Sequence, residues 1–327
     1  MNTVRTNLPV SFFSMAVGTL AWGQCWQAAA LVWQLPAALV VFASALGLLV
    51  WLVLLVGYAY KCWVEPKLVY GEFTHPVQST MTALLPVSTL LAALTLKPWI
   101  PELAWGLLGL GVGSQLVLGL WLAGRFWQGG RSPDSMNASV YLPSVAQNFV
   151  AATACASFAC PTLAALFFGA GLFSWLALDS MVTGRAATLA SLEPAQRPVQ
   201  GIQLAPPVVG GLSYLSLTSG PPDLMALMLF GYGLYQALLA IRQLPWTLQA
   251  PFAPSYWAFS FGVMALASMG LRLWARAPAS APDEWLWPLL ATVLFALANG
   301  VLVVLLWYTA RLGLQGRRLP NLRKENT

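Results

Sequence analysis

The chain has 327 residues, of which 58% are hydrophobic and only 8% are charged, and its mean hydropathy is +0.70. A soluble domain carries about 25% charged residues, so this composition excludes water as the main solvent of the protein. The net charge of +6 comes from basic residues spread over expected loops and the C-terminal tail, which excludes a compact nucleic-acid surface. We expect an all-α integral membrane protein, because lipid offers the backbone no hydrogen-bond partners.

Apolar runs between Pro, Gly and charged residues predict ten transmembrane helices, each near the roughly 20 residues that cross the hydrocarbon core. In chain order the predicted spans are residues 9–30, 35–61, 76–96, 102–124, 141–160, 162–183, 201–219, 222–248, 254–276 and 283–312. Residues 1–9 lack the cleavage site of a secretory signal, so we expect the first helix to be retained. The prediction is one transmembrane domain, residues 1–327.

The distribution of Lys and Arg predicts which side of the membrane the loops face. If both termini lie on one face, that face holds Arg5, Lys61, Lys67, Arg125, Arg131, Arg185, Arg197, Arg242, Arg311, Arg317, Arg318, Arg323 and Lys324. The opposite face holds Lys97, Arg272 and Arg276, which completes the 16 basic residues. The positive-inside rule then places both termini in the cytoplasm.

Prolines recur at the start of every second predicted span. They are Pro9, Pro76, Pro143, Pro206 and Pro254. The first two intervals are equal, which is the sequence signature of an internal repeat. The repeating unit is a helical hairpin, and we expect five hairpins around a central pore.

The odd-numbered spans each offer a narrow, uncharged face of small side chains at helical spacing. The candidate pore-lining residues on these faces are Ser11, Ser14, Gly18, Ser79, Thr82, Pro86, Ser144, Asn148, Pro207, Gly210, Ser213, Ala258 and Ala265. Small residues also let membrane helices pack closely, and that is the alternative for each face. Five such faces on alternate helices favour a pore, with the Leu-, Val- and Phe-rich even spans as an outer wall.

Phe261 is the one bulky ring on the small face of the ninth span. A hydrophobic constriction can gate a narrow pore by dewetting, so Phe261 is the candidate gate, with ordinary packing as the alternative. Cation channels and proton-coupled carriers have carboxylates or His within the membrane. In this sequence only Asp179 and His75 come near such a position. The remaining hydroxyls, backbone dipoles and helix N-termini favour anions.

Several short segments, in order along the chain, carry a family resemblance. They are Tyr58-Ala-Tyr-Lys61, His75-Pro-Val77, Tyr141-Leu-Pro143, Asn148-Phe149, Leu166-Phe-Phe-Gly-Ala-Gly171, Ser191-Leu-Glu-Pro194, Leu204-Ala-Pro206, Gly231-Tyr-Gly233, Leu244-Pro-Trp246 and Trp257-Ala-Phe-Ser-Phe-Gly262. With these segments the chain resembles the family of TehA-type tellurite-resistance proteins and dicarboxylate transporters, whose relatives include the plant guard-cell slow anion channels.

The resemblance implies ten helices in five hairpins, a homotrimer with one pore per protomer, and passive conduction of small anions such as chloride and nitrate. It implies a bacterial inner-membrane location. It also implies a gate, since the family's occluding phenylalanine falls on Phe261. The family names leave tellurite and dicarboxylates open as substrates.

Two other functions remain open at this point. A proton-coupled exporter of tellurite, dicarboxylates or lipophilic cations would use His75 or Asp179 as its relay. A membrane scaffold or sensor would use the small-residue faces for packing alone and would pass no ion. We expect neither an enzyme nor a metal or other cofactor, because no base stands within local reach of a nucleophile and the four cysteines lack zinc spacing.

Overall fold

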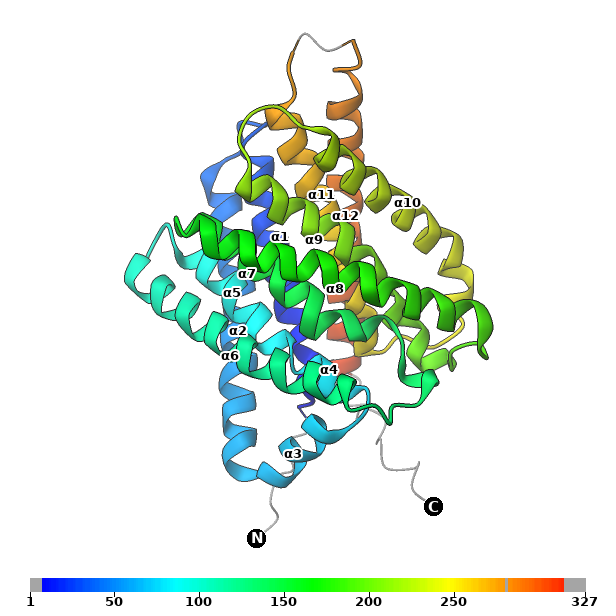
Figure 1. Ribbon diagram of the computed structural model, residues 1–327. Helices are drawn as coiled ribbons and strands as arrows, with labels where there is room; N and C mark the ends of the chain where they lie inside the picture. The colour runs from blue at the N-terminus through cyan, green and yellow to red at the C-terminus, as the bar shows by residue number, and fades with distance from the viewer. Residues whose placement is uncertain (1–7, 280–281, 315–327) are drawn as a thin grey trace.

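The computed structural model describes residues 8–279 and 282–314, and within these ranges the chain forms helices and no strand (Figure 1). The predicted all-α class is therefore confirmed for the described residues. Arg5 and the basic residues from Arg317 onward, which the charge distribution assigns to the cytoplasmic face, lie outside these ranges.

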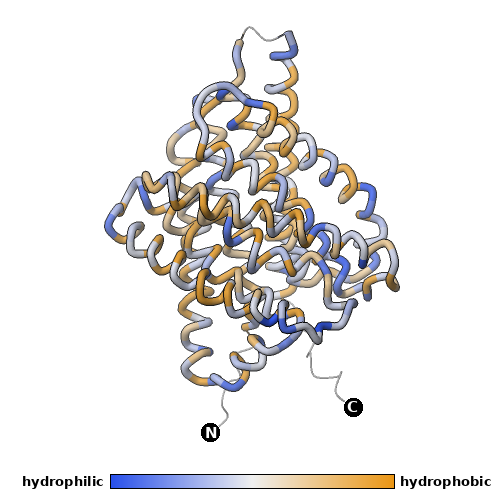
Figure 2. Tube along the Cα trace, in the orientation of Figure 1, coloured by the Kyte–Doolittle hydropathy of each residue, from blue (hydrophilic) through white to orange (hydrophobic). Residues whose placement is uncertain are grey.

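Five long helices form an outer layer. They are α2 (Ala37–Val64), α6 (Pro101–Trp127), α8 (Pro161–Thr188), α10 (Leu224–Thr247) and α12 (Leu286–Leu314). In their most apolar stretches only 22% to 28% of the residues are buried inside the protein. Figure 2 shows hydrophobic residues along the helices, as expected for an exposed surface that faces lipid.

Five shorter helices form an inner layer. They are α1 (Phe13–Ala29), α5 (Leu84–Leu96), α7 (Gln147–Ser157), α9 (Ala205–Leu217) and α11 (Ala258–Arg276). Each packs against the outer helix that follows it in the chain, and the inner helices contact one another in the order α1, α5, α7, α9, α11 and back to α1. The inner layer is therefore a closed ring.

Seven segments of the described chain are long and apolar enough to cross a membrane. They are the five outer helices together with Gln78–Leu96, which joins α4 (Gln78–Met81) to α5, and Pro254–Arg276, which contains α11. The protein is therefore a multi-pass membrane protein. The other three predicted spans coincide with α1, α7 and α9, whose 17, 11 and 13 residues are short for a span.

Irregular helical turns lead into these three short helices. A 3-10 turn, Val10–Phe12, precedes α1, a π-helical turn, Leu142–Ala146, precedes α7, and a 3-10 segment, Pro194–Leu204, precedes α9. Such backbone at membrane depth is tolerated where protein surrounds it. Two of the prolines that recur at the starts of the predicted spans lie in or next to this irregular backbone. Pro143 lies inside the π-helical turn, and Pro206 lies in the first turn of α9.

Gly47 of α2 sets the close approach of α2 to α1. A Cβ atom at Gly47 would lie 2.9 Å from both the Leu20 Cα and the Thr19 carbonyl oxygen, so only backbone motion could relieve the clash. We expect Gly47→Ala to lower the unfolding free energy by about 1–3 kcal/mol, seen as a lower melting temperature in detergent. Gly109→Ala on α6 is the matched control, because a Cβ there meets nothing within 4 Å. Equal melting temperatures for the two variants would contradict this packing.

One α-helix of the described residues lies outside the predicted spans. The loop expected after the second span contains α3 (Pro66–Thr74), which begins with proline at its first turn and has no buried residue. It lies at the same end of the molecule as α4 and the start of α1 (Figure 1). Its Glu72 accepts a hydrogen bond from the Val10 N–H, next to the start of α1.

Candidate functional site

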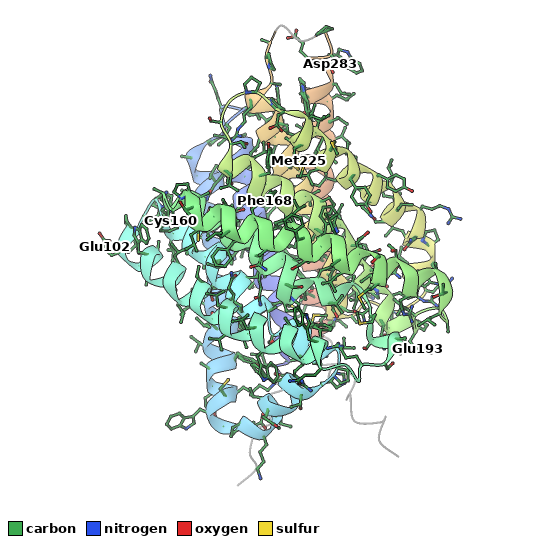
Figure 3. The ribbon with its side chains drawn as sticks, in the orientation of Figure 1. Glu102, Cys160, Phe168, Glu193, Met225 and Asp283 are labelled. Atoms are coloured by element: carbon green, nitrogen blue, oxygen red, sulfur yellow. The ribbon has the colours of Figure 1, made fainter. Side chains whose placement is uncertain are left out.

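A large cavity of about 1050 Å³ lies at one end of the inner ring. Residues from every inner helix or its leading turn line it, including Ser11, Ser14, Val17, Met81, Leu84, Val87, Leu142, Ala146, Ile202, Ala205, Ala258 and Phe261. Its rim includes His75 and Glu193, both exposed. In Figure 3 Glu193 lies far from Asp283, so the cavity opens at the end opposite the α11–α12 connection.

A second cavity, of about 50 Å³, continues along the ring on the other side of Phe261. All five inner helices contribute to it through Ala21, Gln24, Leu91, Leu94, Val150, Thr153, Val209, Leu212, Ser216, Phe261, Ala265, Ser268 and Arg272. Phe261 is the one residue that lines both cavities. Its half-buried ring therefore lies where the wide cavity meets the narrow one.

Hydrogen bonds and close packing hold the helical turn that precedes Phe261. The Trp257 indole N–H donates to the Thr309 hydroxyl of α12 at 2.9 Å, and the Ser260 hydroxyl donates to the Trp257 carbonyl at 2.6 Å. Gly18 lets α1 approach this turn, because a Cβ there would lie 2.1 Å from the Ser260 Oγ. These contacts anchor the backbone that carries the Phe261 ring.

The structure divides the predicted site residues into two groups. Ser11, Ser14, Ala258, Phe261 and Ala265 line the cavities. The other predicted residues are not among the lining residues of these two cavities: Gly18, Ser79, Thr82, Pro86, Ser144, Asn148, Pro207, Gly210 and Ser213. On α11, and on α1 apart from Gly18, the predicted small-residue face thus follows the cavities, whereas on α5, α7 and α9 it does not.

Close packing explains several members of the second group. A Cβ at Gly210 would lie 2.9 Å from the Phe149 ring of α7, and the Asn148 Cβ would lie 3.3 Å from a Cβ at Gly171 of α8. Thr82 donates its hydroxyl proton to the Ser79 carbonyl at 2.7 Å, and both side chains are buried. On these helices the predicted small residues bring neighbours together, while mainly Leu and Val side chains line the cavities. The π-helical turn before α7 contains one more residue than a turn of α-helix. The side chains that follow are therefore rotated about the helix axis relative to the face that regular α-helical spacing predicts.

Comparison with known proteins agrees with this architecture. A family model described as voltage-dependent anion channel (SLAC1) matches residues 7–310. The chain belongs to the SLAC1 family. A tellurite resistance protein TehA homolog from Haemophilus influenzae is 34% identical over 265 residues, which are 80% of each chain.

Of the polar residues that line the narrow cavity of this SLAC1-family chain, Gln24 and Arg272 were not among those predicted from the sequence. Gln24 continues the α1 face and Arg272 continues the α11 face. The signal for Arg272 was present, because the face that contains Phe261, Ala265 and Ser268 reaches position 272 after one more helical turn. The distribution of charges instead placed Arg272 on the membrane face opposite the termini.

A buried ion pair in this SLAC1-family chain ties α3 to the start of α1. Lys61 is 4% exposed, and its ammonium donates to Glu72 Oε1 at 2.7 Å and to the Leu8 carbonyl at 2.9 Å. Glu72 also accepts from the Tyr58 hydroxyl at 2.9 Å and from the Val10 N–H at 3.2 Å. The cluster therefore holds the beginning of the first inner helix beside the mouth of the large cavity.

The two candidate proton-relay residues have structural partners. His75 is exposed, and its Nδ1 accepts from the backbone N–H groups of Val77 and Gln78 at 3.1 Å, which caps the turn into α4. Asp179 accepts from the Tyr141 hydroxyl at 2.9 Å and from the Trp175 indole N–H at 3.3 Å. Asp179 lines neither cavity. Among the described residues, no group of three or more His, Cys, Asp or Glu could hold a metal ion.

Proposed function

We propose that the protein is a passive channel or uniporter for small anions such as chloride and nitrate, and that Phe261 occludes its pore. The observation that carries this proposal is the position of Phe261, which is shared by two cavities that otherwise have different linings. All five helices of the closed ring line the narrow cavity, and each of them or its leading turn lines the large one. A ring of this kind with one aromatic constriction suits gating by dewetting.

The charges along the path support anions over cations. Glu193 is the one acidic residue among those that line the two cavities, and it is exposed on the rim of the large one. Past Phe261 the charged lining residue is Arg272. A path for cations would carry carboxylates at this depth, whereas this path carries a guanidinium.

The proposal includes ten spans in five hairpins with both termini in the cytoplasm of a bacterial inner membrane. The five outer-inner helix pairs and the excess of Lys and Arg near the termini support it. The large cavity would then open to the cytoplasm and the narrow cavity would face the opposite side. A homotrimer with one pore per protomer stays a prediction, testable by mass measurement of the detergent-solubilised protein.

Flux from liposomes tests the proposed function. Purified wild-type protein and Phe261→Ala are reconstituted into vesicles loaded with potassium chloride, and chloride efflux is followed after dilution into a chloride-free impermeant salt with a potassium ionophore present, so that potassium carries the balancing charge. We expect faster efflux from the Phe261→Ala vesicles than from wild-type or protein-free vesicles. Efflux equal to that of protein-free vesicles from both proteins, with correct folding shown by their melting curves, would contradict the proposal.

Proton-coupled export is the second candidate, since His75 lies on the rim of the large cavity. Its capping role predicts that His75→Asn leaves anion flux within about twofold of the parent, because Asn is also a good cap. The same is expected of Asp179→Asn, which changes a residue outside both cavities. Flux is measured with and without a pH gradient. Loss of flux in either variant, or flux driven by the gradient, would favour the exporter.

A further inference from the structure

Two arginines one helical turn apart on α11 have different surroundings. Arg276 donates to the carbonyls of Leu215 at 2.7 Å and Thr218 at 3.1 Å, so it is satisfied by the end of α9. Arg272 lines the narrow cavity, and its Nε is buried without a hydrogen-bond partner. Within the described residues Arg272 forms no ion pair with a carboxylate.

No hydrogen bond joins Arg272 to a hydroxyl group of the narrow cavity, and these hydroxyls have no proton left to donate to a bound anion. Thr153, Ser216 and Ser268 each donate their proton to the carbonyl four residues earlier in their own helix, at 2.8 to 3.1 Å. Gln24 uses one amide N–H on the Thr95 hydroxyl at 3.1 Å and keeps its second N–H. The side-chain donors left at the cavity are therefore the Arg272 guanidinium and one Gln24 N–H.

A guanidinium in a small cavity with few competing groups creates a local positive potential, to which the nearby Arg276 adds. The cavity volume of about 50 Å³ has room for one small ion and not for a dicarboxylate. Arg272 is half-buried, and an unpaired charge that is partly removed from water is stabilised by a counter-ion. The occupant that fits both the charge and the volume is a small monovalent anion.

We propose that Arg272 and Gln24 form a binding site for one small monovalent anion, of the halide or nitrate class, on the far side of Phe261 from the large cavity. Arg272 supplies charge-assisted hydrogen bonds and Gln24 supplies one amide N–H. The site repels cations, so it also selects the sign of the ion that can cross. Its role in conduction rests on the proposed function, whereas its existence does not.

Bromide binding to the purified protein tests the site without any need for conduction. We expect bromide to raise the melting temperature of the wild-type protein and to give anomalous X-ray scattering density beside Arg272. Arg272→Gln should raise the bromide dissociation constant about tenfold or more, since a hydrogen bond to a charged group is lost. Arg272→Lys, which keeps the charge, should retain most of the binding.

Lys97→Gln is the matched control, because it removes a cation that contacts the Ser157 carbonyl and lines neither cavity. Its bromide affinity should equal that of the wild type. Equal bromide affinities in wild type, Arg272→Gln and Lys97→Gln, or bromide density away from Arg272, would overturn the site. A folded Phe261→Ala protein that binds bromide at Arg272 but passes no anion would leave the site standing and refute the proposed function.

Discussion

Phe261→Ala is expected to raise anion current on the order of tenfold or more at equal surface expression, the effect of a barrier lowered by about 1.4 kcal/mol or more. The ring lies where the cavity of about 1050 Å³ narrows to one of about 50 Å³. Its removal joins the two spaces and lets water and the anion pass without dehydration against an aromatic face. The current should scale inversely with side-chain size, with Phe261→Leu between Ala and the wild type.

Phe173→Ala is the matched control for this series. Phe173 lies on the outer helix α8 with 71% of its surface exposed, so its ring faces away from the ring of inner helices. Loss of this ring should leave the current unchanged. A Phe173→Ala protein that conducts as well as Phe261→Ala, or a folded Phe261→Ala protein with wild-type current, would count against Phe261 as the gate.

Loss of one partner of the Lys61–Glu72 pair is expected to destabilise the protein by about 3–5 kcal/mol, because it leaves a buried charge without a counter-charge. The side chains are only 5% and 13% exposed, and the pair also holds the Leu8 carbonyl and the Val10 N–H. Lys61→Met and Glu72→Gln should each lower the melting temperature markedly. The double variant Lys61→Met/Glu72→Leu should recover part of the loss, since no charge remains buried.

Lys67→Met provides the comparison for this prediction. Lys67 is an exposed residue of α3, where removal of a charge should shift the unfolding free energy by about 0.5 kcal/mol or less. A Lys61→Met melting temperature equal to that of Lys67→Met would show that the pair contributes little. A double variant less stable than both single variants would contradict the buried-charge explanation.

The helices of this protein were largely predictable from its sequence. Long apolar runs such as Ala37–Val64 and Leu286–Leu314 dictate their own conformation, because a lipid-facing backbone must satisfy its hydrogen bonds internally. The short inner helices α7 and α9 were predicted in place, but their lead-in turns were not. Local π and 3-10 geometry depends on which neighbours surround the backbone, and the sequence of one segment does not contain that information.

The candidate site was predictable only in part, for a physical reason. On a membrane helix a small residue can face a cavity, as Ser14 does, or a neighbouring helix, as Gly210 does. Both positions favour small, uncharged side chains, so composition does not distinguish them. Phe261 stood out because a large ring on a small face is unusual in either setting. Arg272 could have been found by extending that same face, whereas the Lys61–Glu72 pair depends on how α3 folds back.

We propose that the inner ring encloses an anion path blocked by Phe261. The test is the reversal potential of Phe261→Ala in a planar bilayer with a potassium chloride gradient across it. We expect current that reverses at the chloride equilibrium potential, with little current from the wild-type protein under the same conditions. Reversal at the potassium equilibrium potential, or no current from a correctly folded variant, would contradict it.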